Sequence, residues 1–205
     1  MMMKNKFFFF ICFCFITTIF HGQSVRVVPG LNWSSLKSST EFNILDSKVR
    51  TFSIGLATDL YTEEKFMVSS ELSYFQLGGR EKNPLIESWE DYSKKWSYLS
   101  FNSTFRYKII SDKQGYVFLG VGPQLNLNID SGKFDDTLYE GNFKMKTINL
   151  GAVVEGGYLR DLSSKVQMGI LAKYMYPITS FSTNEFVNFS FHPYSINLML
   201  GYKLL

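Results

Sequence analysis

His192 is the residue of this chain best suited to chemistry, because the other histidine, His21, lies in an N-terminal segment of a different character. Ser190 and Glu185 are close to His192 in sequence. A histidine that takes a proton from a serine, with a carboxylate to orient it, cleaves or transfers acyl groups. However, no spacing motif joins the three residues, and a lone histidine at a strand end is more often a surface residue. We therefore expect no enzyme, and keep acyl transfer at this His/Ser pair as an alternative.

A second group of polar residues could hold a metal ion. Asn128, Asp130, Asp135 and Asp136 surround Gly132. A calcium loop of the EF-hand type needs oxygen ligands at fixed offsets, with a glycine at the sixth place and a glutamate at the twelfth. Here the glycine falls one residue early. The segment is therefore predicted to be a solvated acidic loop, and we expect neither a metal nor another cofactor.

The remaining candidate site residues are charged and share one alternate phase of the chain. They are Arg26, Asp59, Glu71, Arg106, Lys108, Glu155, Lys173 and Lys203. The opposite phase is apolar. For example, Leu99, Phe101 and Phe105 follow one another at spacings of two and four residues, so all three fall on the same face of a strand. A period of two is typical of β-strands with two different faces, whereas a helical period of 3.6 would scatter these residues over all faces.

The elements that carry these residues are eight such alternating stretches between Ser24 and Leu205, which predict an all-β chain. The connections between them alternate short and long. We expect short connections at 62–64, 111–114 and 161–165, and long ones at 34–48, 79–94, 130–142 and about 179–193. This sorting is typical of an antiparallel up-and-down transmembrane β-barrel, which has short periplasmic turns and long external loops.

Aromatic residues indicate that the apolar face of this barrel contacts lipid. They make up 17% of the chain, with 20 Phe and 12 Tyr. Belts of amphipathic rings form where a membrane meets water. One predicted belt, near the short turns, holds Tyr107, Tyr158 and Tyr202; the other, near the long loops, holds Trp33, Tyr74, Tyr174 and Tyr176. Eight strands leave an interior that side chains fill, so the charged phase is predicted to pair up as a structural polar network that plugs the lumen.

The first residues are interpreted as a cleavable signal peptide, residues 1–22, followed by one barrel domain, residues 23–205. Lys4 and Lys6 precede an apolar run over 7–20, which is too short to span a membrane as a helix. Both cysteines lie in this segment. Outside it the charge is nearly balanced, since two of the 21 basic residues are removed and 18 acidic residues remain. Clustered positive charge is missing, so we expect no nucleic-acid partner.

Four short motifs resemble those of the PorT-like family of outer-membrane β-barrel domains. They are Pro29-Gly30-Leu31-Asn32, Ser70-Glu71-Leu72-Ser73-Tyr74, Leu119-Gly120-Val121-Gly122-Pro123 and Leu200-Gly201-Tyr202-Lys203. The resemblance covers nearly all of the chain after the signal peptide. It implies the outer membrane of a Gram-negative bacterium, with outer-membrane lipid and the barrel-assembly machinery as partners. The name-giving member serves a protein-secretion system, so an accessory role in secretion is a further alternative.

Taken together, these patterns predict a non-enzymatic barrel with a structural role, or one that binds an extracellular ligand or protein partner through its loops. Loops on a rigid scaffold are where binding residues gather. The candidate loop contacts are Phe134, Tyr139, Phe181, Phe186, Phe189 and Phe191. A soluble barrel that carries a lipophilic ligand is a rival, but it would point its aliphatic residues inward.

Overall fold

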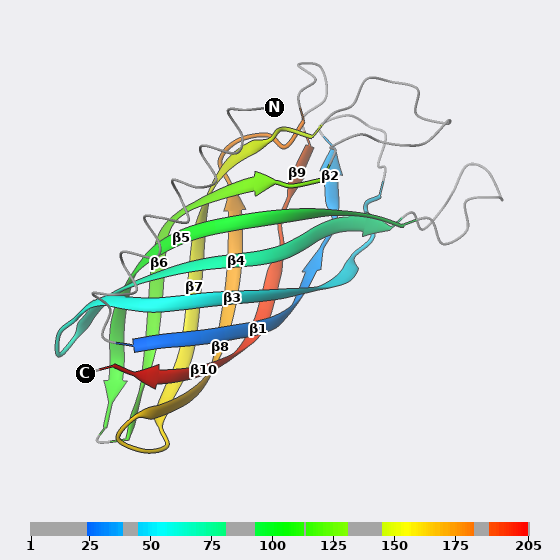
Figure 1. Ribbon diagram of the computed structural model, residues 1–205. Coiled ribbons are helices and arrows are strands. Elements are labelled where there is room, and N and C mark those ends of the chain that lie inside the picture. Colours follow the sequence, from blue (N-terminus) through cyan, green and yellow to red (C-terminus); the bar gives the residue numbers. More distant parts are fainter. Residues whose placement is uncertain are drawn as a thin grey trace.

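The chain forms a closed antiparallel β-barrel of eight strands, as predicted (Figure 1). The computed structural model describes residues 24–38, 45–80, 93–112, 114–130, 145–182 and 189–204, so the predicted signal peptide lies outside the described residues. The barrel strands are β1 (Ser24–Ser34), β3 (Val49–Thr62), β4 (Phe66–Arg80), β5 (Ser93–Ser111), β6 (Gly115–Asn128), β7 (Ile148–Asp161), β8 (Val166–Pro177) and β10 (Tyr194–Lys203). Each strand pairs with its neighbours in sequence, and β1 pairs with β10 to close the barrel. Within the described residues, no helix has the length and hydropathy needed to cross a membrane.

The connections sort by length to the two ends of the barrel, which confirms the predicted alternation. Short connections at 63–65, 112–114 and 162–165 lie at one end, here called the inner end. Long connections at 35–48, 81–92, 129–147 and 178–193 lie at the other, the outer end. In outer-membrane barrels, short turns face the periplasm and long loops face the outside. By this rule, the outer end is expected to face the cell exterior.

The alternation of the strands matches the two faces of the barrel wall. Ile170 and Leu119 on the predicted outward phase are 60% and 57% exposed, whereas Arg26 and Glu71 on the inward phase are 0% and 3% exposed. An apolar outer surface of this extent is stable in contact with lipid hydrocarbon and not in contact with water.

Two details of the strands were not predicted. The long connections at 35–48 and 178–193 contain β2 (Leu36–Ser38) and β9 (Phe189–Phe191), which pair with each other as a separate two-stranded sheet (Figure 1). In β3, the register with β4 shifts between Asp59 and Tyr61, so Leu60 is half-buried and Tyr61 is exposed. A β-bulge of this kind moves the following residues to the other face.

The interior contains two apolar clusters in addition to the predicted polar network. The inner cluster comprises Val28, Ala57, Phe118, Leu159, Leu171 and Met199. The outer cluster comprises Phe75, Leu77, Trp96, Tyr98 and Met175 from the barrel wall, together with Leu36, Leu45, Met145, Phe181, Phe189 and Phe191 from the long connections. Segments of the outer connections therefore fold into the barrel mouth and pack apolar side chains against the wall there.

Candidate functional site

The charged residues of the inward phase form ion pairs inside the barrel. Arg26 of β1 pairs with Asp59 of β3, and both side chains are buried. The serine hydroxyls on either side complete this group. Ser24 donates to Asp59 Oδ2 at 2.8 Å, and Arg26 Nη2 donates to Ser69 Oγ at 3.1 Å. A buried ion pair is tolerated when its remaining polar atoms are hydrogen bonded, as most are here.

A second buried pair joins β5 to β7. Arg106 Nε lies 2.5 Å from Glu155 Oε1, which also accepts a hydrogen bond of 2.6 Å from Thr104. The guanidinium carbon of Arg106 lies 4.7 Å from the centre of the Phe118 ring, a cation–π contact with the inner apolar cluster. Polar and apolar side chains therefore fill this part of the lumen side by side.

The third pair crosses the lumen between strands that are not neighbours. Lys173 of β8 donates to both carboxylate oxygens of Glu71 on β4. A fourth pair, Lys203 with Asp161, lies at the inner end, and its two side chains are 30% and 33% exposed. Lys108 was expected to face a carboxylate. Instead, Lys108 Nζ donates to the backbone carbonyl of Glu63 at 2.7 Å and lies over the Tyr116 ring, because Arg26 already occupies Asp59.

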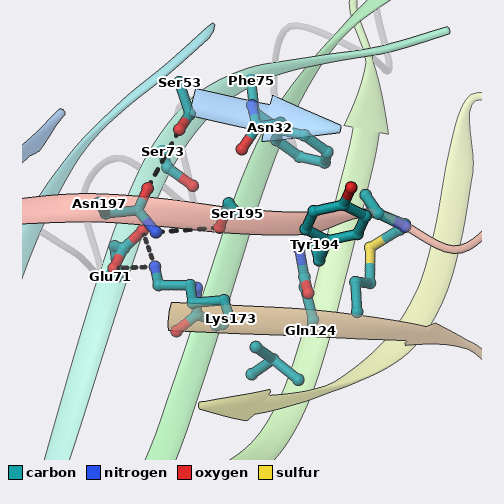
Figure 2. Close-up of a pocket in the computed structure, with 14 residues that line it drawn as sticks. Asn32, Ser53, Glu71, Ser73, Phe75, Gln124, Lys173, Tyr194, Ser195 and Asn197 are labelled. Atoms are coloured by element: carbon teal, nitrogen blue, oxygen red, sulfur yellow. Dashed lines mark hydrogen bonds and ion pairs between the residues drawn. The ribbon is translucent and has the colours of Figure 1, made fainter. Parts of the chain in front are cut away.

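The Lys173–Glu71 pair borders a cavity of about 50 Å³ (Figure 2). Around it are hydroxyls and amides, and at its outer side are Phe75 and Met175 of the outer cluster. The polar residues that line the cavity are Asn32, Ser53, Ser73, Asn102, Gln124, Ser195 and Asn197. This volume accommodates a few water molecules, since one water needs about 10–15 Å³. Asn32 Nδ2 is buried and has no hydrogen-bond partner among the described residues, so a water molecule there would satisfy it.

The aromatic candidates for partner contact are placed differently from the prediction. Phe181, Phe189 and Phe191 are 1%, 3% and 0% exposed and belong to the outer cluster. Phe181 and Phe191 meet edge to face at 5.1 Å, and Trp96 lies 5.7 Å from Phe191. Their expected role as loop contacts is therefore corrected. Their apolar surface packs inside the barrel mouth and does not face an outside partner. Phe134, Tyr139 and Phe186 lie outside the described residues.

The candidate catalytic group does not assemble among the described residues. His192 Nδ1 is 2.9 Å from the Tyr174 hydroxyl, and its ring stacks on Tyr174. No hydrogen bond joins His192 to Ser190 in the described part of the chain, and Glu185 is outside it, as are Asp135 and Asp136 of the acidic loop. Burial, with a smaller effect of nearby Lys37, lowers the pKa of His192 below 6.5. Both effects favour the neutral form of the ring.

Sequence reasoning missed the apolar residues of the lumen, and the signal for them was weak. Phe118 lies between Val117 and Leu119, so apolar residues occupy both phases of β6 at this point. The same is true of Leu171 between Ile170 and Ala172. In a barrel strand, an uninterrupted apolar run indicates that part of the lumen is apolar.

Two solved structures resemble this barrel along most of its length. Neisserial surface protein A matches with a TM-score of 0.55 and 16% identity, over 88% of this chain and 97% of that one. The outer membrane protein OprG from Pseudomonas aeruginosa matches with a TM-score of 0.59 and 14% identity, over 90% of this chain and 97% of that one. At these identities the likeness concerns the fold. No curated protein matches the sequence.

A family model described as outer membrane protein beta-barrel domain matches residues 22–183. That match, the closed barrel of eight strands and its apolar outer surface agree with one another, and they locate the protein in the outer membrane of a Gram-negative bacterium. The chain therefore belongs to the outer membrane protein beta-barrel domain family.

Proposed function

We propose that the protein is a non-conducting, non-enzymatic scaffold that holds four long loops outside the cell. The observation that carries this proposal is the filling of the lumen. The outer cluster packs inside the mouth, and the Arg26–Asp59 and Arg106–Glu155 pairs with the inner cluster fill the part below the cavity. The interior of an eight-stranded barrel is narrow enough for side chains to occupy it fully.

Planar-bilayer recording tests whether the lumen conducts. The folded protein should give no steady, ion-selective current, because ions would have to displace apolar side chains and paired charges. The matched variants are Phe191→Ala and Ile196→Ala, which remove side chains from the outer cluster and from the lipid-facing surface, respectively. Steady wild-type currents of uniform size would contradict the proposal.

The loop-binding role is tested by shortening the connections at 81–92 and 129–147 one at a time with short glycine–serine linkers. Because the wall strands supply the barrel hydrogen bonds, each variant should still show the heat-modifiable gel mobility of a folded barrel. Attachment of cells to a surface of host or bacterial polymers should fall with at least one shortened connection. Unchanged attachment with either connection shortened would contradict binding through these two connections.

Acyl transfer at His192 is the alternative that can be tested directly. The Tyr174 hydrogen bond occupies Nδ1 of His192 and leaves Nε2 as the remaining ring nitrogen. Wild type and His192→Ala should both be inactive in a lipid A deacylation assay. Activity of the wild type that is lost in His192→Ala would establish the enzyme in place of the scaffold. The PorT-like relationship within the wider family stays a prediction, and so does an accessory role in protein secretion.

A further inference from the structure

One row of outward-facing side chains crosses four neighbouring strands at the outer end of the barrel. Arg50 of β3 is the cross-strand partner of Trp33 on β1, and Trp33 is the partner of Tyr194 on β10. Tyr194 is in turn the partner of Tyr174 on β8. The Trp33 and Tyr194 rings are nearly parallel, at 10°, with centroids 5.4 Å apart. These four residues, here called the outer aromatic row, lie side by side in the register of the four strands.

His192 and Tyr176 extend the outer aromatic row on the β8 side. The His192 ring stacks on Tyr174 and meets Tyr176 edge to face at 6.2 Å. Tyr174 and Tyr176 are 40% and 56% exposed. Because Nδ1 of His192 is bonded to Tyr174, Nε2 is the ring nitrogen available to a partner from outside.

Three cations accompany these rings. Lys48 Nζ lies 4.9 Å from the centre of the Tyr194 ring, Arg50 is next to Trp33, and Lys37 is near enough to His192 to influence its titration. None of the three forms an ion pair within the described residues, where each of the four pairs uses other cations. Asp46 is the exposed acid nearby, and its Oδ1 accepts a hydrogen bond from Ser47. The outer aromatic row therefore carries positive charge that the described residues do not neutralise.

The position of the row along the barrel indicates which part of the membrane it meets. Below Tyr194 on β10, the outward residues are Ile196, Leu198 and Leu200, all exposed to the hydrocarbon. Rings with a polar group lie where hydrocarbon gives way to lipid headgroups. At the inner end, Tyr202 is followed by Lys203, which is paired with Asp161. Lys37, Lys48 and Arg50 thus face the headgroups of the outer leaflet.

We propose that the outer aromatic row, with Lys48 and His192, binds the headgroup of a phosphorylated glycolipid in the outer leaflet. Arg50 and Lys48 hold a phosphate group, because a guanidinium matches phosphate oxygens with two parallel hydrogen bonds and an ammonium adds a point charge. The apolar face of a sugar ring packs against Trp33 and Tyr194. Sugar hydroxyls bond to His192 Nε2 and to the tyrosine hydroxyls, which serve as the polar ends of the rings.

Lipid retention in nanodiscs tests this site with three defined probes. The folded protein is placed in phosphatidylcholine nanodiscs that contain a small fraction of diphosphoryl lipid A, of fully dephosphorylated lipid A, or of phosphatidylglycerol, and native mass spectrometry counts the lipid that stays bound. Wild type should retain diphosphoryl lipid A at least about tenfold better than either other probe. This comparison needs no variant, so it decides the proposal even if a substitution impairs folding.

Paired substitutions then separate the two halves of the site. The double variant with Lys48→Gln and Arg50→Gln should lose the preference for phosphorylated over dephosphorylated lipid A. The double variant with Trp33→Leu and Tyr194→Leu should lose the preference for lipid A over phosphatidylglycerol. The matched control, Arg160→Gln with Tyr202→Leu at the inner end, should retain both preferences.

Three outcomes would overturn the proposal. Equal retention of phosphatidylglycerol by the wild type would mean that the cations attract any anionic lipid. Retention of no probe would remove the site altogether. Equal loss in the inner-end control would mean that the rings act only as a general membrane anchor.

Discussion

A Cβ atom on Gly201 would lie 2.4 Å from Cγ of Arg26, so Gly201 provides the space through which the Arg26 side chain passes. The two residues are cross-strand partners on β10 and β1. Gly120 has the same relationship to Arg106, whose Cγ would lie 2.8 Å from a Cβ there. Inward-facing glycines are thus matched to the long charged side chains of the next strand. The ion-pair network depends on where side chains are missing as well as on where charges are present.

Replacing Gly201 with alanine should destabilise the barrel. The added methyl would push Arg26 away from Asp59, and overpacking of this kind costs about 1–3 kcal/mol. Urea unfolding in lipid vesicles measures the change in the free energy of unfolding. Gly156→Ala is the matched control, because a Cβ on Gly156 would meet only the terminal Cδ2 of Leu119, at 2.9 Å, and the backbone carbonyl of Phe118, at 3.7 Å. An equal loss in both variants would show that the effect comes from β-strand glycines in general.

Removing one partner of the Lys173–Glu71 pair should cost more than removing both. Lys173→Met leaves the carboxylate of Glu71, which is 4% exposed, without its cation, and breaking a buried pair in this way costs about 3–5 kcal/mol. The double variant Lys173→Met with Glu71→Gln removes both charges and should recover most of that loss. A double-mutant cycle from urea unfolding measures the coupling between them.

The exposed pair at the inner end is the control for this cycle. Lys203 and Asp161 lie 2.7 Å apart but are each about a third exposed. Water therefore screens them, and their coupling should be below about 1 kcal/mol. A coupling for Lys173 and Glu71 as small as this value would argue that water in the adjoining cavity already screens the pair.

The barrel wall could be predicted from the sequence because the alternation of β5 or β10 separates two chemically different faces. Phe101 and Phe105 face outward and Asn102, Thr104 and Arg106 face inward, as their order indicates. Connection lengths supplied the remaining information, since short and long segments alternate. Both signals are local, because neither the alternation nor the connection lengths depend on which strands pair.

The pairing inside the lumen could not be predicted in the same way. Lys173 and Glu71 are 102 residues apart on strands that are not neighbours, so their contact depends on the stagger of the closed barrel. A period of two fixes the face of each residue and leaves its height along the barrel axis open. The burial of Phe189 and Phe191 was missed for a related reason: β9 lies in a long connection, where an aromatic residue can face either solvent or the barrel mouth.

Lys37 should influence the titration of His192. Burial is the larger cause of the lowered His192 pKa and Lys37 is the smaller one, so Lys37→Gln should raise the pKa toward 6.5 without reaching it. Because the folded state holds the proton less tightly than the unfolded state, the neutral ring contributes fully above pH 6.5. That contribution is lost as the pH falls through the lowered pKa. NMR titration of the imidazole measures the shift.

Lys65→Gln is the control for this titration, since Lys65 is an exposed cation at the opposite, inner end. It should leave the His192 pKa unchanged. The same experiment reports on the hydrogen bond to Tyr174, because Tyr174→Phe removes the partner of Nδ1. If Lys37→Gln and Lys65→Gln shift the His192 pKa equally, the influence is that of net charge and not of the nearby ammonium.

A lysine introduced on the outer surface should cost stability according to its depth in the membrane. Ile170 and Ile178 are 60% and 65% exposed, but Ile170 lies in the middle of β8 and Ile178 follows its outer end. Ile170→Lys should therefore cost about 2–4 kcal/mol and Ile178→Lys at most about 1 kcal/mol in lipid vesicles. Urea unfolding of both variants measures this difference. In water, two equally exposed positions would respond alike, so equal effects in vesicles would contradict contact between hydrocarbon and the middle of β8.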